Sequence, residues 1–172
     1  MIDEIKNLIQ SKNFDQAIKK LELIKDNNNS EIYFLLGSLY LSKKDFDKAE
    51  KNLKSSCKLD ENNPKSFHNL GVLKLSQKKT NDAKSFFEKA YAKDNNYINP
   101  LIELAKIYED EKNFNEAKKF YFKALAIDNK NYIVNFRIAR FLHNNFYFKE
   151  SSEYYKKSIG FIRLSSKKPE II

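Results

Sequence analysis

Four alanines recur along this 172-residue chain at a nearly constant interval. They are Ala17, Ala49, Ala83 and Ala117; the last two intervals are identical and the first is slightly shorter. Two glycines, Gly37 and Gly71, are separated by the same full interval, and each lies twelve positions before one of the alanines. Small residues at fixed phases let two helix backbones approach closely, so the period predicts a repeated helical unit and fixes which side chains face the core.

Apolar residues follow the same period at three- and four-residue spacing, which is the mark of one apolar helical face. With the alanine counted as position 20, the second repeat places an aromatic residue, Leu, Gly and Tyr at positions 4, 7, 8 and 11, namely Tyr33, Leu36, Gly37 and Tyr40. This pattern, with its period of about 34 residues, resembles the tetratricopeptide repeat (TPR) family.

The resemblance implies an all-α fold, a right-handed α-solenoid (an α–α superhelix) of about five helix–turn–helix repeats. The expected repeats are residues 1–29, 30–63, 64–97, 98–131 and 132–164, with a C-terminal tail at 165–172. The middle three are clear, although Lys74 and Thr80 stand where the family usually has apolar residues. The ends are weaker: Ser151 replaces the alanine of the fifth repeat, and Asn135 stands at its aromatic position 4.

Asx residues mark the expected helix ends. Asp45 and Asn113 directly precede a phenylalanine and are predicted N-caps of second helices. The segments 60–64, 94–96 and 128–131 are rich in Asp and Asn and resemble turns between repeats. Side chains of this kind can end a helix by hydrogen-bonding to the nearby backbone.

Composition favours an intracellular helical protein. No run of eighteen apolar residues occurs, so no membrane span is expected. The N-terminus lacks the basic flank and apolar block of a signal peptide. The single cysteine, Cys57, excludes an internal disulfide framework, and a cytoplasmic location is the default expectation.

A net charge of +9 raises the question of nucleic-acid binding. The excess is spread evenly, +4 over residues 1–86 and +5 over 87–172, with acidic residues interleaved throughout. A solvated charged surface explains this pattern better than a nucleic-acid stripe, so no specific nucleic-acid partner is expected.

The sequence offers no convincing catalytic or metal-binding motif. Its three glycines form no phosphate-binding loop, and His68 and His143 lie far apart in the sequence without ligands at metal-binding spacing. We interpret Cys57 as a structural thiol on the packed side of a helix, since no histidine is placed to activate it. We expect no enzyme activity, no metal and no cofactor.

The family resemblance implies a binding groove formed by first-helix positions 2, 5, 6, 9, 12 and 13, called the groove positions below. Two of the chain's three arginines fall there, near other cations, and their planar guanidinium groups suit carboxylate recognition. The alternative is that Arg137 pairs with Glu103, which holds the same position in the preceding repeat. The candidate partner-binding residues are Phe34, His68, Asn69, Lys106, Phe136, Arg137, Arg140 and His143.

Two specialised family functions are absent at the residues that would perform them. No register places the Lys and Asn set of the chaperone-type carboxylate clamp, and Asn69 alone matches the asparagine ladder of sugar-transferring members. We therefore expect a non-catalytic scaffold that binds a protein or peptide in its groove. The alternatives are the repeat region of a larger enzyme of the glycosyl-, sulfo- or methyltransferase type, or a subunit docking domain.

The C-terminal end suggests a further contact. Phe161, Ile162 and Leu164 could prolong the last helix, but no additional amphipathic helix follows to cover it. An uncovered end leaves apolar surface in water. Self-association through the C-terminal repeat, or docking on another domain, is therefore an open expectation.

Overall fold

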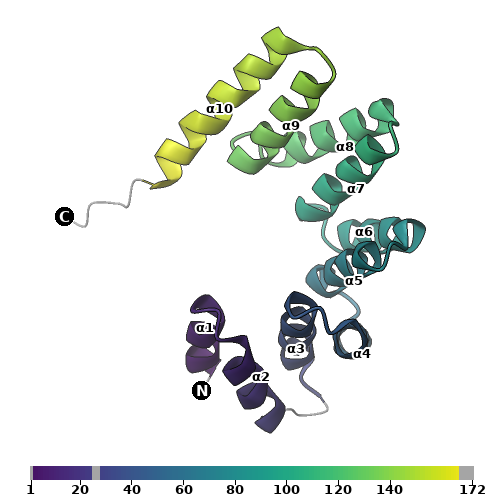
Figure 1. Cartoon of the computed structure of the whole chain (residues 1–172), viewed down its shortest axis with the longest axis vertical. Helices are drawn as coiled ribbons and strands as arrows, with labels where there is room; N and C mark the ends of the chain where they lie inside the picture. The colour runs from purple at the N-terminus through teal and green to yellow at the C-terminus, as the bar shows by residue number, and fades with distance from the viewer. Residues whose placement is uncertain (1, 25–27, 167–172) are drawn as a thin grey trace, which may run out of the picture. The chain divides into compact units, whose positions relative to one another are not determined.

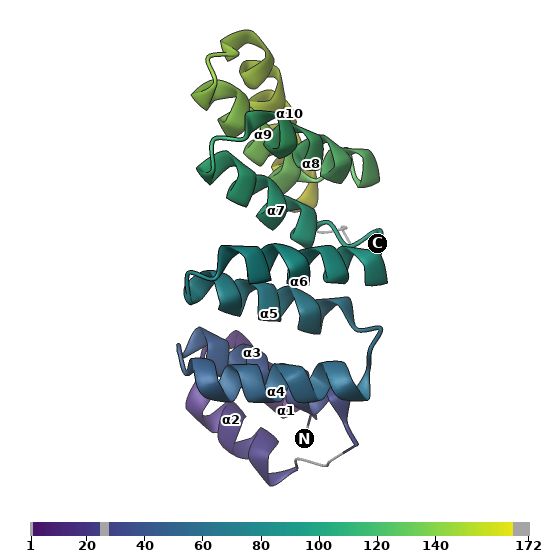
Figure 2. The ribbon, with the colours of Figure 1, turned by 90° about the vertical axis from the view of Figure 1, so that its right-hand side faces the viewer.

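The computed structural model describes residues 2–24 and 28–166 of the chain. Within these residues it contains ten α-helices and no strand, which confirms the predicted all-α fold. The helices belong to two compact units, Met1–Tyr97 and Ile98–Ile172. Each unit consists of consecutive helix pairs joined by short turns (Figures 1 and 2).

The first unit contains three pairs and the second contains two. The pairs of the first unit are α1 (Ile2–Gln10) with α2 (Phe14–Leu23), α3 (Ser30–Ser42) with α4 (Phe46–Leu59), and α5 (Pro64–Ser76) with α6 (Thr80–Lys93). Those of the second are α7 (Asn99–Asp110) with α8 (Phe114–Ile127), and α9 (Tyr132–Asn144) with α10 (Phe148–Ser166). Helix α10 has 19 residues, so it extends into the segment expected as a tail.

The small residues lie where the two helices of a pair touch. Ala49, Ala83 and Ala117 have no exposed surface. Ser151, which takes the alanine position of the last repeat, is also buried, and its hydroxyl donates a hydrogen bond to the Ala139 carbonyl (2.9 Å). The polar substitute is therefore satisfied, and the packing phase predicted from the sequence holds through the fifth repeat.

The turn inside each pair is built the same way five times. One residue in each turn has a positive φ of 59° to 67°, and the residue after it donates a backbone hydrogen bond to the carbonyl five positions earlier. This is the Schellman arrangement, which closes the last carbonyls of the first helix. Glycine usually holds the left-handed position, but here the residues are Lys12, Lys44, Lys78, Lys112 and Phe146.

Asx side chains close the helix starts and the turns between pairs. The Asp45 and Asn113 side chains accept hydrogen bonds from the Lys48 and Glu116 amides at 3.2 and 3.4 Å, which confirms both predicted N-caps. In the turns between repeats, one carboxylate oxygen accepts a bond from the amide two residues on, in each case at 2.9–3.1 Å; these carboxylates are Asp60, Asp94 and Asp128. The three segments are thus Asx turns.

Lys74, the first departure from the apolar pattern, is buried but paired. Its ammonium donates to both carboxylate oxygens of Glu50 at 2.9 Å, linking α5 to α4. Lys54 binds the same carboxylate at 2.8 Å. The aliphatic stem of Lys74 therefore fills an apolar position while its charge is compensated by the preceding repeat.

Asn135, which stands at the aromatic position 4 of the fifth repeat, is fully buried and links a turn to α9. Its amide donates to the backbone carbonyls of Asn129 (2.9 Å) and Asn131 (2.8 Å). The side chain thus replaces an aromatic packing contact with two hydrogen bonds to backbone carbonyls of the turn. Among the described residues, no helix has the length and apolar character needed to cross a membrane.

Candidate functional site

In the first unit, the predicted site residues come together between α3 and α5. The Asn69 amide donates to Ser38 Oγ at 2.7 Å, and Ser38 Oγ donates to the Phe34 carbonyl at 2.7 Å. His68 Nδ1 lies 3.3 Å from Asn69 Oδ1 and donates to it. Phe34, His68 and Asn69 are therefore members of one hydrogen-bonded chain of neighbours.

The aromatic rings next to these hydrogen bonds pack against other side chains and do not face an open groove. The His68 imidazole lies 5.4 Å from the Phe87 ring and 5.5 Å from the Tyr97 ring, and it is half-buried. Phe34 packs against the core cluster formed by Ala49, Leu53, Leu70 and Leu73. In this unit the groove positions thus stabilise the contact between repeats.

A shallow hollow lies beside this packed region. It has a volume of about 550 Å³ and lies over the end of α3 and the outer turns of α5. Leu41 and Val72, both groove positions, form its apolar wall, and Ser42 and Ser76 provide hydroxyl groups at its edge. The hollow is wide enough for apolar side chains of a bound peptide.

In the second unit, the groove positions of α9 carry two guanidinium groups that have no acceptor among the described residues. Arg137 and Arg140 are half-buried, and neither donates a hydrogen bond or forms an ion pair within the described part of the chain. The expected alternative partner, Glu103, binds the Lys106 ammonium instead, at 2.7 Å. Pairing of Arg137 with Glu103 is therefore not the arrangement found.

The Glu109 carboxylate lies near Tyr121, as the two arginines do, and one of its oxygens already accepts a hydrogen bond. Its Oε2 accepts a hydrogen bond from the Tyr121 hydroxyl at 3.0 Å. Burial raises the pKa of Tyr121, and the Glu109 charge raises it further, while the positive charges of Arg140 and Arg137 act in the opposite direction. Both guanidinium groups therefore lie close enough to this pair to influence it, without binding it.

Phe136 and His143 complete the predicted set on α9. Phe136 is half exposed and meets the Tyr155 ring edge-on at 5.8 Å. His143 is exposed and meets the Phe148 ring edge-on at 5.2 Å. In the described part of the second unit, exposed aromatic surface is thus combined with three cations at groove positions, Lys106, Arg137 and Arg140, of which only Lys106 is paired.

The cysteine and the acidic residues offer little chemistry. Burial raises the pKa of the Cys57 thiol to about 11, so it stays protonated and weakly nucleophilic near neutral pH. Among the described residues, no group of three or more His, Cys, Asp or Glu side chains is placed to hold a metal ion.

Sequence reasoning missed two features of the site. Tyr121 and Glu109 lie twelve residues apart in a helix pair, and nothing in the repeat pattern indicates that they bond. The left-handed turn residues could have been found, because Lys12, Lys44, Lys78, Lys112 and Phe146 follow the same period as the alanines. The change from Lys to Phe in the fifth repeat is visible in the sequence alone.

Two family sequence models, both described as tetratricopeptide repeat, match residues 30–63 and 74–133. Together they account for more than half of the chain. A comparison with curated protein sequences gives no match.

Solved structures similar to this chain include several that are distant in sequence. The structure of MamA is 20% identical over 95% of this chain and 97% of that chain, with a TM-score of 0.74. PilF of Pseudomonas aeruginosa is 19% identical over 93% and 74%, with a TM-score of 0.80. A chain of the Cut9–Hcn1 hetero-tetramer of the APC/C is 17% identical over 91% and 32%, with a TM-score of 0.74. At these identities the likeness establishes the fold alone.

Proposed function

The chain belongs to the tetratricopeptide repeat family, and on that premise we propose that it is a non-catalytic module that binds an acidic segment of a partner protein at its groove positions. The observation that carries the proposal is the pair Arg137 and Arg140. Both are half-buried on α9; the Glu103 carboxylate binds Lys106, and the Glu109 carboxylate accepts a hydrogen bond from Tyr121. Two partly desolvated guanidinium groups with no acceptor in the described part of the chain favour binding of external carboxylates.

The surroundings suit a peptide better than a small ion. Phe136 and His143 lie on the same helix, and their exposed rings can pack against apolar side chains that neighbour the acidic residues of a peptide. In the first unit, the hollow beside Leu41 and Val72 offers an independent apolar contact. The fold also occurs in a chain whose structure was determined within a hetero-tetramer, Cut9–Hcn1, which supports a role in protein assembly.

The test uses fluorescence anisotropy of a labelled peptide with paired glutamates and flanking leucines, at low salt to limit screening. Replacing Arg137 and Arg140 together with Ala should weaken binding by about 2–5 kcal/mol if the contact is desolvated. Replacing both with Lys should restore only part of the loss, since Lys keeps the charge but not the planar fork.

The charge-matched control is Lys130→Ala with Lys156→Ala, two exposed lysines outside the groove positions. It should leave peptide affinity nearly unchanged. Because the arginines form no ion pair with described residues, the double Ala variant should also melt within a few degrees of the wild type. An equal loss of affinity in the control would reduce the site to nonspecific charge attraction, and a large loss of stability would make the arginines structural.

A further inference from the structure

The fifth repeat departs from the others at one strained turn. Four repeats place Lys at the left-handed turn position, whereas the fifth places Phe146 there, at φ 67°. A bulky aromatic residue is disfavoured in this conformation. Its ring gains no burial in exchange, because Phe146 is 80% exposed. Neither local conformation nor packing within the described chain accounts for an aromatic side chain here.

The two residues after Phe146 are also exposed aromatic residues. Tyr147 and Phe148 are each 55% exposed, and the Phe146 and Phe148 rings meet edge-on at 6.1 Å. We call Phe146, Tyr147 and Phe148 the aromatic turn. Exposed apolar groups that are clustered, rather than scattered singly, mark an interaction surface.

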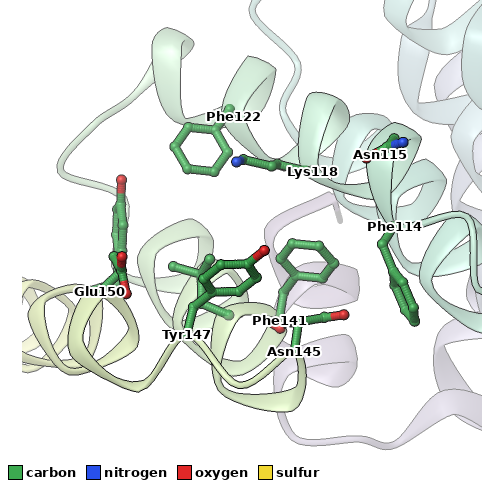
Figure 3. Close-up of a pocket in the computed structure, with 10 residues that line it drawn as sticks. Phe114, Asn115, Lys118, Phe122, Phe141, Asn145, Tyr147 and Glu150 are labelled. Atoms are coloured by element: carbon green, nitrogen blue, oxygen red, sulfur yellow. Dashed lines mark hydrogen bonds between the residues drawn. The ribbon is translucent and has the colours of Figure 1, made fainter.

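A pocket of about 440 Å³ opens directly beside the aromatic turn (Figure 3). It lies between α8 and the start of α10, with the end of α9 as its floor, and Asn145 and Tyr147 on either side of Phe146 both line it. Its size is typical of sites that bury a side chain or small ligand. Its aromatic walls are Phe114, Phe122, Phe141, Tyr147 and Tyr154.

The pocket also carries one charge of each sign. Lys118 lies on the α8 wall and Glu150 on the α10 wall, apart from each other in Figure 3. Neither forms an ion pair with another described residue, and the Lys118 ammonium lies 5.9 Å from the centroid of the Phe122 ring. Each is therefore available to a charge brought in by whatever occupies the pocket.

We propose that the occupant is a second copy of this chain, bound about a two-fold axis so that the Phe146 ring of each copy enters the pocket of the other. In a two-fold contact, if residue i of one copy meets residue j of its partner, then j meets i as well. A projection and a pocket side by side on one molecule satisfy that condition. Lys118 and Glu150 satisfy it too, since each then meets the opposite charge on the other copy.

The proposal deepens the expectation of self-association but moves it from the helix end to the α9–α10 turn. Two inserted phenyl rings would bury about 300–500 Å². A stable dimer buries about 1,200–2,000 Å² in total, so Tyr147, Phe148 and Phe114 must contribute and the dimer should be weak. We expect dissociation in the micromolar range. The contact is separate from Arg137 and Arg140, so either proposal can fail without the other.

The test is sedimentation velocity of the full chain from about 5 to 500 µM. The wild type should shift from monomer to dimer across this range. Phe146→Lys should weaken dimerisation at least tenfold and still fold, because Lys occupies the same turn at a similar φ in four other repeats. Lys130→Glu, an exposed substitution outside the pocket, should leave the dimer unchanged.

Charge reversal identifies the second copy as the occupant. Lys118→Glu and Glu150→Lys should each weaken self-association, because like charges then meet twice. Mixing the two variants should restore dimers, since contacts between opposite charges are again available. A wild type that stays monomeric at the highest concentration, a dimer unaffected by Phe146→Lys, or a mixture that stays monomeric would each overturn the proposal. The Arg137→Ala and Arg140→Ala double variant should dimerise like the wild type, since neither arginine lines this pocket, which separates this result from the groove.

Discussion

Helices α5 and α9 occupy the same place in their repeats but treat their polar groove positions in opposite ways. On α5, His68 and Asn69 are bonded to each other and, through Ser38, to α3. On α9, Arg137 and Arg140 reach no acceptor among the described residues, although they lie near the Tyr121–Glu109 pair. Equivalent groove positions can therefore either join neighbouring repeats or present charged groups to a partner. Which of the two occurs depends on whether a polar side chain of the preceding repeat lies within hydrogen-bond distance.

The two units also differ at the small position of the first helix. In α3 and α5 it is glycine, whereas in α7 and α9 it is alanine: Gly37, Gly71, Ala105 and Ala139. All four are buried. A Cβ added to Gly71 would lie 2.6 Å from the Phe87 ring, and one added to Gly37 would lie 2.6 Å from Leu53 Cγ. At these two points the Leu53 and Phe87 side chains of the second helices leave no room for a methyl group.

The largest expected effect tests what the two units share. Ala83→Leu in α6 and Ala117→Leu in α8 force bulk into fully buried helix contacts and should destabilise by roughly 1–3 kcal/mol each. The matched controls are Ala92→Leu and Ala126→Leu, exposed alanines on the same helices, which should change stability by less than about 0.5 kcal/mol. Urea unfolding measures all four. Equal effects at buried and exposed alanines would show that the repeats are wrongly phased.

A smaller effect distinguishes the units at the glycine position. Gly71→Ala gains about 0.5–1 kcal/mol of helix propensity but must displace the buried Phe87 ring, so a net loss of about 1 kcal/mol is expected. Gly160→Ala in α10 places its methyl group more than 4 Å from any described atom beyond its chain neighbours and the nearby backbone of its own helix, and should instead stabilise by about 0.5–1 kcal/mol. Thermal or urea unfolding of both variants gives the sign. Stabilisation by both would mean that the close approach at Gly71 relaxes freely.

The smallest effect concerns pH and belongs to the first unit. Hydrogen bonds from Lys54 and Lys74 lower the pKa of Glu50 below its ordinary value. In acid, Glu50 therefore binds more protons in the unfolded chain than in the folded one. Its contribution to the free energy of unfolding is complete above about pH 4.3, the pKa of Glu in an unfolded chain, and is lost as the pH falls through the lower pKa of the folded state. Lys74→Met should flatten the decline in unfolding free energy between about pH 5 and 3. Identical pH profiles for the variant and wild type would show that the Lys74 contact is not maintained in solution.

The fold could be predicted because its main determinants are periodic. Ala49, Ala83 and Ala117 each lie at the same buried helix contact in their repeats. A wrong assignment of the phase in one repeat would therefore disagree with the other two. The caps at Asp45 and Asn113 were equally accessible, since capping depends on the three residues that follow. Packing contacts and helix caps that recur at a fixed period can be predicted from the sequence alone.

The site was less accessible because its determinants are exceptions to the period. Lys74 looks like a defect until its partner Glu50, in the preceding repeat, is known to lie beside it. Asn135 looks like a missing aromatic residue until its bonds to the turn carbonyls are seen. The pocket beside Phe146 depends on the distance between α8 and α10, which no repeat pattern specifies.

Because the turns between repeats share the same Asx geometry, whole repeats can be removed from or added to this chain without altering the junctions. Asp60 and Asp94 form the same bond to the amide two residues on, and one full period of the repeat separates them. A deletion or duplication that runs from one of these aspartates to the next rebuilds an equivalent junction. Unequal recombination between repeats would therefore shorten or extend the array without creating a new turn, whereas insertions of other lengths would break the helix phase.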